Sequence, residues 1–168
     1  ATDIGMDILL KGGNAVDAAV AVSFALAVVN PSAGNIGGGG FMLIHLSEID
    51  ETIALDYRER APIKSFEKMF LDQNEKVIKG LSLNSTLASG VPGTVSGMFY
   101  ASKKFGSMNI EKLISPSIEI ARNGFNLSEF QAKNLNKYRG KILNSVEAKQ
   151  IFTKPNGFKE GDVLIQKN

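Results

Sequence analysis

Arg58 is the residue whose type and place most clearly demand a binding partner. It follows residues 52–57 (TIALDY), a segment with few polar side chains, and a guanidinium beside such a segment needs an anion. Two partners fit. Asp56 lies two residues earlier on the same face of an extended chain and would form a structural ion pair, whereas a ligand carboxylate would form a bidentate recognition site. Spacing alone favours Asp56.

A run of glycines offers a second candidate site. Residues 34–40 read GNIGGGG, and backbone N–H groups without side chains around them can wrap an anion such as phosphate. The run precedes a strand-like segment instead of joining a strand to a helix, and neither Lys-Ser nor Lys-Thr follows it. We therefore expect close backbone packing, or a loop that lies against a ligand or another strand, and no nucleotide site.

His45 is the only histidine, and the chain has no cysteine, so a metal site lacks a suitable set of ligands. Serines and aspartates are numerous enough for a Ser-His-Asp arrangement on paper, but no Gly-x-Ser-x-Gly sequence is present. Because His45 lies inside an apolar segment, the pattern favours a hydrogen-bonded core histidine. We expect neither a metal nor a cofactor.

Two helices precede the glycine run. Residues 3–11 form an amphipathic pattern, and residues 15–29 are apolar on all sides of a helix. Asn14 suits the N-cap of the second helix, and Asp17 three residues later completes a capping-box pattern. Pro31 prevents the helix from continuing. An all-round apolar helix has to be covered by neighbouring layers.

Arg58 itself is predicted to end a strand. Residues 41–46 and 52–58 indicate two strands joined by a polar turn, most simply a hairpin with both faces largely covered. Alternation along the second strand divides its side chains between the two faces, with Ala54, Asp56 and Arg58 opposite Ile53, Leu55 and Tyr57.

The rest of the chain is mostly helical. The patterns predict helices at residues 94–104, 109–114, 115–123 and 128–138, the third of them starting with Ser115 as cap and Pro116 in the first turn. The chain finishes in strand-like residues 163–165.

The composition indicates one ordinary globular segment. Its 168 residues are 43% hydrophobic, which is enough for a core. The longest apolar stretch, residues 15–29, is shorter than the roughly 18–20 residues that cross a bilayer, so we expect no membrane span. Residues 61–168 carry sixteen basic and nine acidic groups, scattered without interleaved aromatic residues. This is typical of a solvated surface and not of a nucleic-acid groove.

Four motifs in this order resemble the large subunit of gamma-glutamyltransferases, also called glutathione hydrolases. They read GGNAVDAAVA at residues 12–21, NPSAGNIGGGGF at residues 30–41, DYRERAP at residues 56–62 and GVPGTVSG at residues 90–97. The resemblance implies an α+β fold, the αββα four-layer sandwich of the N-terminal-nucleophile hydrolases. It also implies that Arg58 binds the α-carboxylate of a γ-glutamyl group and that Glu59 assists nearby, which reverses the preference for Asp56.

The resemblance further implies that the nucleophile lies outside this chain. In this family it is a threonine that self-cleavage exposes at the N-terminus of the small subunit, and its own α-amine can serve as the base. The family's Thr-Thr-His motif is absent here, since no threonine is followed by another. We expect a segment that is incomplete at both ends, has no internal domain boundary, contains no catalytic residue and is inactive alone.

The implied partners are the small subunit of the same precursor, in a heterodimer, and small substrates such as glutathione and other γ-glutamyl compounds. In bacteria the resemblance implies a periplasmic or secreted protein. Two alternatives stay open: a related amidohydrolase of the cephalosporin acylase or capsule transpeptidase type, and a non-catalytic binding or scaffold domain. The pair Arg58 and Glu59 favours the glutamyl branch.

Overall fold

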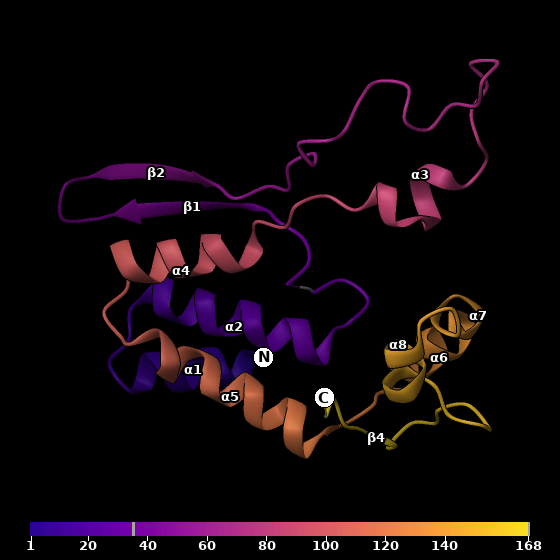
Figure 1. The fold of residues 1–168 in the computed structure, drawn as a ribbon. Coiled ribbons are helices and arrows are strands. Elements are labelled where there is room, and N and C mark those ends of the chain that lie inside the picture. Colours follow the sequence, from indigo (N-terminus) through magenta and orange to yellow (C-terminus); the bar gives the residue numbers. More distant parts are fainter. Residues whose placement is uncertain (35, 168) are drawn as a thin grey trace. The chain divides into compact units, whose positions relative to one another are not determined.

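The computed structural model describes residues 1–34 and 36–167, and these form helices and two small sheets, an α+β chain (Figure 1). The residues group into two compact units, Ala1–Asn35 with Phe99–Asn168, and Ile36–Met98. Helix α4 (Thr94–Phe105) begins in the second unit and ends in the first. The absence of a domain boundary, expected from the sequence, stays a prediction.

Helix α2 is the centre of the first unit. It spans Ala15–Val29, as predicted, and packs against both α1 (Thr2–Leu10) and α5 (Ile110–Asn123) (Figure 1). The small and medium apolar side chains of these helices that lose nearly all exposure are Ile8, Val20, Ala21, Ala25 and Leu113. Across residues 1–34 and 36–167, no helix is both long and apolar enough to span a bilayer.

The N-terminus of α2 carries the predicted capping box and an additional long-range contact. The Asn14 side chain accepts from the N–H groups of Val16 and Asp17, and the Asp17 carboxylate accepts from the Asn14 N–H at 2.9 Å. Asp17 is fully buried and also accepts from the Ser107 hydroxyl at 2.7 Å, the Ser107 N–H at 3.0 Å and the Met108 N–H at 3.3 Å. Asp17 therefore fixes the turn after α4 to the start of α2.

The C-terminus of α2 is completed by two glutamine side chains from late in the chain. Gln131 donates to the Val29 carbonyl at 2.6 Å, and Gln166 donates to the Val28 carbonyl at 2.8 Å. The last carbonyls of a helix have no partner within the helix, so these two bonds satisfy groups that would otherwise need water.

The prediction of two helices at residues 109–123 is wrong. Two helices were expected, with a break at Ser115-Pro116, but one helix runs through Pro116. The proline ring removes a single backbone hydrogen bond within the helix. Leu113 and Ser117, one on each side of Pro116, are both buried, and α5 packs along α2. Tertiary packing of one continuous face therefore outweighs the local preference for a break.

The C-terminal part of the first unit consists of short elements. Strand β3 (Phe125–Asn126) pairs with β4 (Val163–Leu164), and between them lie α6 (Glu129–Lys137), α7 (Arg139–Ile142) and α8 (Val146–Phe152). The predicted helix at residues 128–138 and the strand near residue 163 are confirmed. Ser128 caps α6 in a capping box with Gln131.

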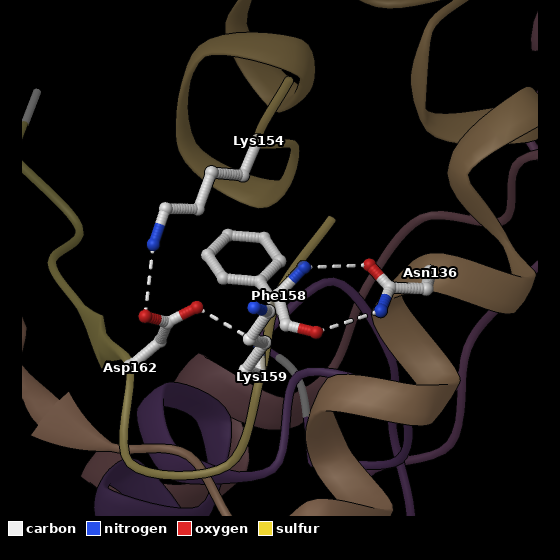
Figure 2. A network of polar contacts seen from close by, with 5 residues as sticks. All are labelled: Asn136, Lys154, Phe158, Lys159 and Asp162. Atoms are coloured by element: carbon white, nitrogen blue, oxygen red, sulfur yellow. Dashed lines mark hydrogen bonds and ion pairs between the residues drawn. The ribbon is translucent and has the colours of Figure 1, made fainter. Parts of the chain in front are cut away.

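Side chains clasp the loop between α8 and β4 (Figure 2). The amide of Asn136 on α6 makes two bonds to the backbone of Phe158, donating to its carbonyl and accepting from its N–H, each at 2.8 Å. Asp162 accepts from Lys154 Nζ and from the Lys159 N–H, also at 2.8 Å. The hydrogen bond from Lys154 is the main cause that lowers the pKa of Asp162.

We expect Asn136→Ala to loosen this loop without unfolding the unit. Two neutral hydrogen bonds contribute about 1 kcal/mol each, so the Phe158 amide should exchange its hydrogen at least fivefold faster. Lys133→Ala on the same helix removes only an exposed pair with Glu129 and serves as the control. Equal exchange rates at Phe158 in the two variants would contradict the clasp.

The second unit holds the predicted hairpin. Strands β1 (Phe41–Leu46) and β2 (Glu51–Asp56) are antiparallel, with Phe41 opposite Asp56 and Leu46 opposite Glu51. A short helix α3 (Leu81–Asn84) and a 3₁₀ turn (Thr86–Ala88) follow a long irregular stretch. The prediction that both hairpin faces are covered is wrong for the described residues, because Phe41 and Leu43 are 66% and 75% exposed.

Candidate functional site

Strand β2 leads into four residues, 57–60, that we call the arginine segment. At its start the Tyr57 N–H donates to the Gly40 carbonyl at 3.0 Å, which extends the hairpin pairing. At its end Arg60 and Val91 exchange two backbone hydrogen bonds of 3.1 and 2.8 Å. The backbone that carries Arg58 and Glu59 is therefore held at both ends.

Within the described part of the chain, the Arg58 guanidinium forms no ion pair. Asp56 was the structural partner that spacing favoured, but its Oδ1 accepts from the Arg58 backbone N–H at 2.9 Å. Among residues 1–34 and 36–167, no carboxylate lies within ion-pair distance of the guanidinium. Arg58 and Glu59 are both exposed, so each charged group is available to a ligand.

Glycines from two distant stretches approach the arginine segment. A Cβ atom on Gly39 would lie 2.6 Å from the Tyr57 carbonyl oxygen and 2.7 Å from the Glu59 nitrogen. A Cβ on Gly93 would collide with the same carbonyl oxygen, and one on Gly97 with the Tyr57 ring. The interpretation of the glycine run as a site of close backbone packing is thus confirmed.

The two glycine stretches are also joined to each other. The Gly38 carbonyl accepts from the N–H groups of Gly93 at 2.8 Å and Thr94 at 3.0 Å, where α4 begins. Sequence reasoning missed that residues 38–40 and 90–97 meet at the arginine segment. Gly93 directly precedes α4 and Gly97 lies four residues later within it, and this spacing is the signal that could have indicated a close approach.

Tyr57 fills the space that these glycines leave. Its ring lies against Gly40, where a Cβ would be 3.1 Å from the hydroxyl oxygen, and against Gly97. Burial raises the pKa of Tyr57, so the hydroxyl remains protonated at neutral pH. The Tyr57 side chain therefore packs between Gly40 and Gly97 as a neutral group.

His45 lies outside this site, and its predicted place in the core is wrong. Its side chain is 55% exposed, and its Nδ1 lies 3.2 Å from the hydroxyl of Thr52, its partner across the hairpin. Asp50 is 4.0 Å from Nε2, too far for a hydrogen bond, and is almost fully exposed. His45 and Thr52 form a solvated surface pair. With Asp50 they do not form a catalytic triad, because the Asp50 carboxylate does not orient the imidazole.

The arrangement can bind charges but offers no obvious acyl-transfer chemistry of its own. Arg58 provides a planar set of donors, and Glu59 provides an acceptor at the next residue. In the part of the chain that the structure describes, no group of three His, Asp or Glu side chains is placed to hold a metal ion. The site is therefore suited to hold a small molecule that carries both charges.

The sequence profile described as gamma-glutamyltranspeptidase matches residues 1–168. The glutathione hydrolase proenzyme of Escherichia coli (strain K12) is 49% identical over 170 residues, which is 100% of this chain and 29% of that protein. This chain thus spans about 29% of the length of that relative.

Solved structures agree with this match. The crystal structure of Helicobacter pylori gamma-glutamyltranspeptidase superposes with a TM-score of 0.93 and 48% identity, over 98% of this chain and 47% of that one. The transpeptidase CapD of Bacillus anthracis superposes with a TM-score of 0.75 and 33% identity, over 98% of this chain and 50% of that one. The predicted fold class, α+β of the N-terminal-nucleophile hydrolases, is confirmed, and the chain belongs to the gamma-glutamyltranspeptidase family.

Proposed function

We propose that this chain is part of the large subunit of an enzyme that cleaves γ-glutamyl amide bonds, with glutathione and its conjugates as substrates. The observation that carries the proposal is the Arg58 guanidinium, which is exposed and unpaired among the described residues while its backbone is fixed at both ends. Family membership and the printed names of the relatives support the reaction class.

Arg58 and Glu59 are the proposed substrate-binding residues. A γ-glutamyl group ends in an α-carboxylate and an α-ammonium on one carbon atom. The guanidinium of Arg58 suits the carboxylate as a two-point donor, and the carboxylate of Glu59 suits the ammonium. When this end is held, the γ-carbonyl carbon lies at a fixed distance from the bound charges. The nucleophile then attacks a carbonyl group that is already oriented toward it.

The attacking hydroxyl is proposed to come from another polypeptide, the small subunit released from the same precursor, in a heterodimer. Its N-terminal threonine forms an ester with the γ-carbonyl carbon as the C–N bond breaks, and the threonine α-amine passes the hydroxyl proton to the departing amine. Water or an acceptor amine then attacks the ester and restores the threonine hydroxyl. A periplasmic or secreted location is part of the same proposal.

Three anilides test this function because they differ only at the recognised end. γ-Glutamyl anilide carries both charges, glutaryl anilide lacks the ammonium, and 4-aminobutanoyl anilide lacks the carboxylate. We expect the whole protein to hydrolyse γ-glutamyl anilide at least tenfold faster than either analogue. Residues 1–168 alone should release no aniline above background. Turnover by this chain alone would refute the assignment of the nucleophile to another polypeptide.

The likeness to the transpeptidase CapD gives a second candidate function, transpeptidation. The resemblance to capsule transpeptidases implies a polymeric substrate for it. Such an enzyme would act on γ-linked glutamyl chains in preference to glutathione. A whole protein that ignores γ-glutamyl anilide but transfers a γ-linked glutamyl oligomer to an amine would favour this candidate. If neither substrate reacts, and glutamate binds equally to the intact protein and to Arg58→Ala in calorimetry, the chain is a scaffold.

A further inference from the structure

The closest approaches around the arginine segment involve its backbone. A Cβ on Gly39 would meet three backbone atoms of residues 57–59 at 2.6 to 2.8 Å, whereas ordinary contacts of a Cβ begin near 3.4 Å. A Cβ on Gly93 would meet the backbone of Tyr57 and, at 3.2 Å, the carbonyl oxygen of Arg58. Backbone atoms cannot rotate away as a side chain can, so any larger residue at these positions must push the segment.

The segment is held at both ends, so a displacement falls on the residues between them. Hydrogen bonds hold Tyr57 to Gly40 and Arg60 to Val91, and the Gly38 carbonyl binds the N–H of Gly93. We call Gly39 and Gly93 the glycine cradle. Hydrogen bonds of neighbouring residues hold the cradle against the arginine segment. A push from the cradle therefore changes the position of residues 58 and 59 instead of being absorbed by a loose loop.

We propose that Gly39 and Gly93 are positioning residues that set where the Arg58 guanidinium and the Glu59 carboxylate meet the amino-acid end of the substrate. The inference rests on the proposed function of Arg58 and Glu59. Each glycine acts through the backbone of the arginine segment. A displacement of about 1 Å in a positioning group can cost about 10²-fold in rate, so a single methyl group in the cradle has a measurable effect.

Gly90 provides a milder perturbation of the same segment. Its Cβ would lie 3.1 Å from the Glu59 Cβ and 3.4 Å from the Arg60 carbonyl oxygen, contacts that a small adjustment can relieve. Gly140 on α7 is the matched control, since a Cβ there would have no neighbour within 4 Å. Alanine at Gly140 also suits a helix.

The test measures kcat/KM of the whole enzyme on the three anilides. For Gly39→Ala we expect at least a tenfold loss on γ-glutamyl anilide, mostly through a higher KM. The losses on glutaryl and 4-aminobutanoyl anilides should be smaller, because each presents only one of the two charged groups to the displaced segment. Gly90→Ala should lose twofold to fivefold on γ-glutamyl anilide, and Gly140→Ala should match the wild type. Precursor cleavage and the thermal unfolding midpoint are measured for every variant.

The outcomes separate this inference from the proposed function. If Arg58→Ala abolishes the preference for γ-glutamyl anilide while Gly39→Ala and Gly90→Ala keep it, the cradle does not position the segment and only the inference fails. Equal losses on all three anilides in Gly39→Ala would show a general structural role and also overturn it. If Arg58→Ala itself keeps the preference, the proposed function fails. Should Gly39→Ala not fold, Gly90→Ala decides alone, and an unchanged preference there overturns the inference.

Discussion

Arg58→Ala is expected to lower kcat/KM of the whole enzyme on γ-glutamyl anilide about 10³-fold. Two hydrogen bonds between ions contribute about 1.5–3 kcal/mol each, and every 1.4 kcal/mol is a factor of ten. Arg58→Lys keeps the charge but loses the planar two-point contact. This variant should therefore lower kcat/KM on γ-glutamyl anilide by about 10–100-fold. The measurement is initial-rate kinetics on γ-glutamyl and 4-aminobutanoyl anilides.

Arg60 supplies the control for that prediction. It is exposed, lies two residues away and contributes its backbone to the bridge with Val91, which alanine retains. Arg60→Ala should therefore change kcat/KM less than threefold. Equal losses in Arg58→Ala and Arg60→Ala would indicate a general effect of surface charge and would contradict a specific carboxylate contact at Arg58.

Asp17→Ala is expected to destabilise the first unit by about 3 kcal/mol, because it leaves buried N–H groups without an acceptor and opens a cavity. The groups affected are the N–H of Asn14, the N–H and hydroxyl of Ser107 and the N–H of Met108. Hydrogen exchange at the Ser107 and Met108 amides reports this locally. Asp7→Ala removes an exposed pair with Lys11 and should change stability by less than about 0.5 kcal/mol.

The Asp17 carboxylate also makes the stability of the first unit depend on pH. Burial acts to raise the pKa of Asp17, but the bonds from Ser107, Asn14 and Met108 outweigh it, and the pKa is lowered from its usual 3.8. A depressed pKa means that the stabilisation is complete above the pKa of the unfolded chain and is lost as pH falls through the folded one. Protection of the Ser107 amide against hydrogen exchange should therefore weaken only below about pH 4. Loss of protection between pH 5 and 7 would contradict this assignment.

Helices and strands could be predicted from the sequence where their capping residues, prolines and side-chain periodicity lie within a few residues of each other. Asn14 and Asp17 mark the start of α2, Pro31 marks its end, and both boundaries agree with the structure. The hairpin follows from two apolar segments around a polar turn. These features depend on hydrogen bonds and side-chain periodicity inside one stretch of sequence, so they can be read without knowing the fold.

Contacts between distant stretches could not be predicted in the same way. Asp17 was correctly interpreted as a cap, but nothing near it indicates that Ser107 and Met108 bind the same carboxylate. Pro116 looks like a helix start until the packing of α5 on α2 is known. The motifs placed Arg58 in a family, yet its free guanidinium depends on Asp56 being turned to the backbone.

The glutamine bonds at the end of α2 have a consequence for synthesis on the ribosome. Gln131 follows Val29 by 102 residues, and Gln166 follows Val28 by 138. At about 5–20 residues per second, the nascent helix waits at least about 5 s for the first glutamine. During that interval the carbonyls of Val28 and Val29 lack these glutamine donors. Helix α2 is thus synthesised before both of the glutamines that bond its C-terminus, and slower elongation lengthens the time in which these two carbonyls depend on water.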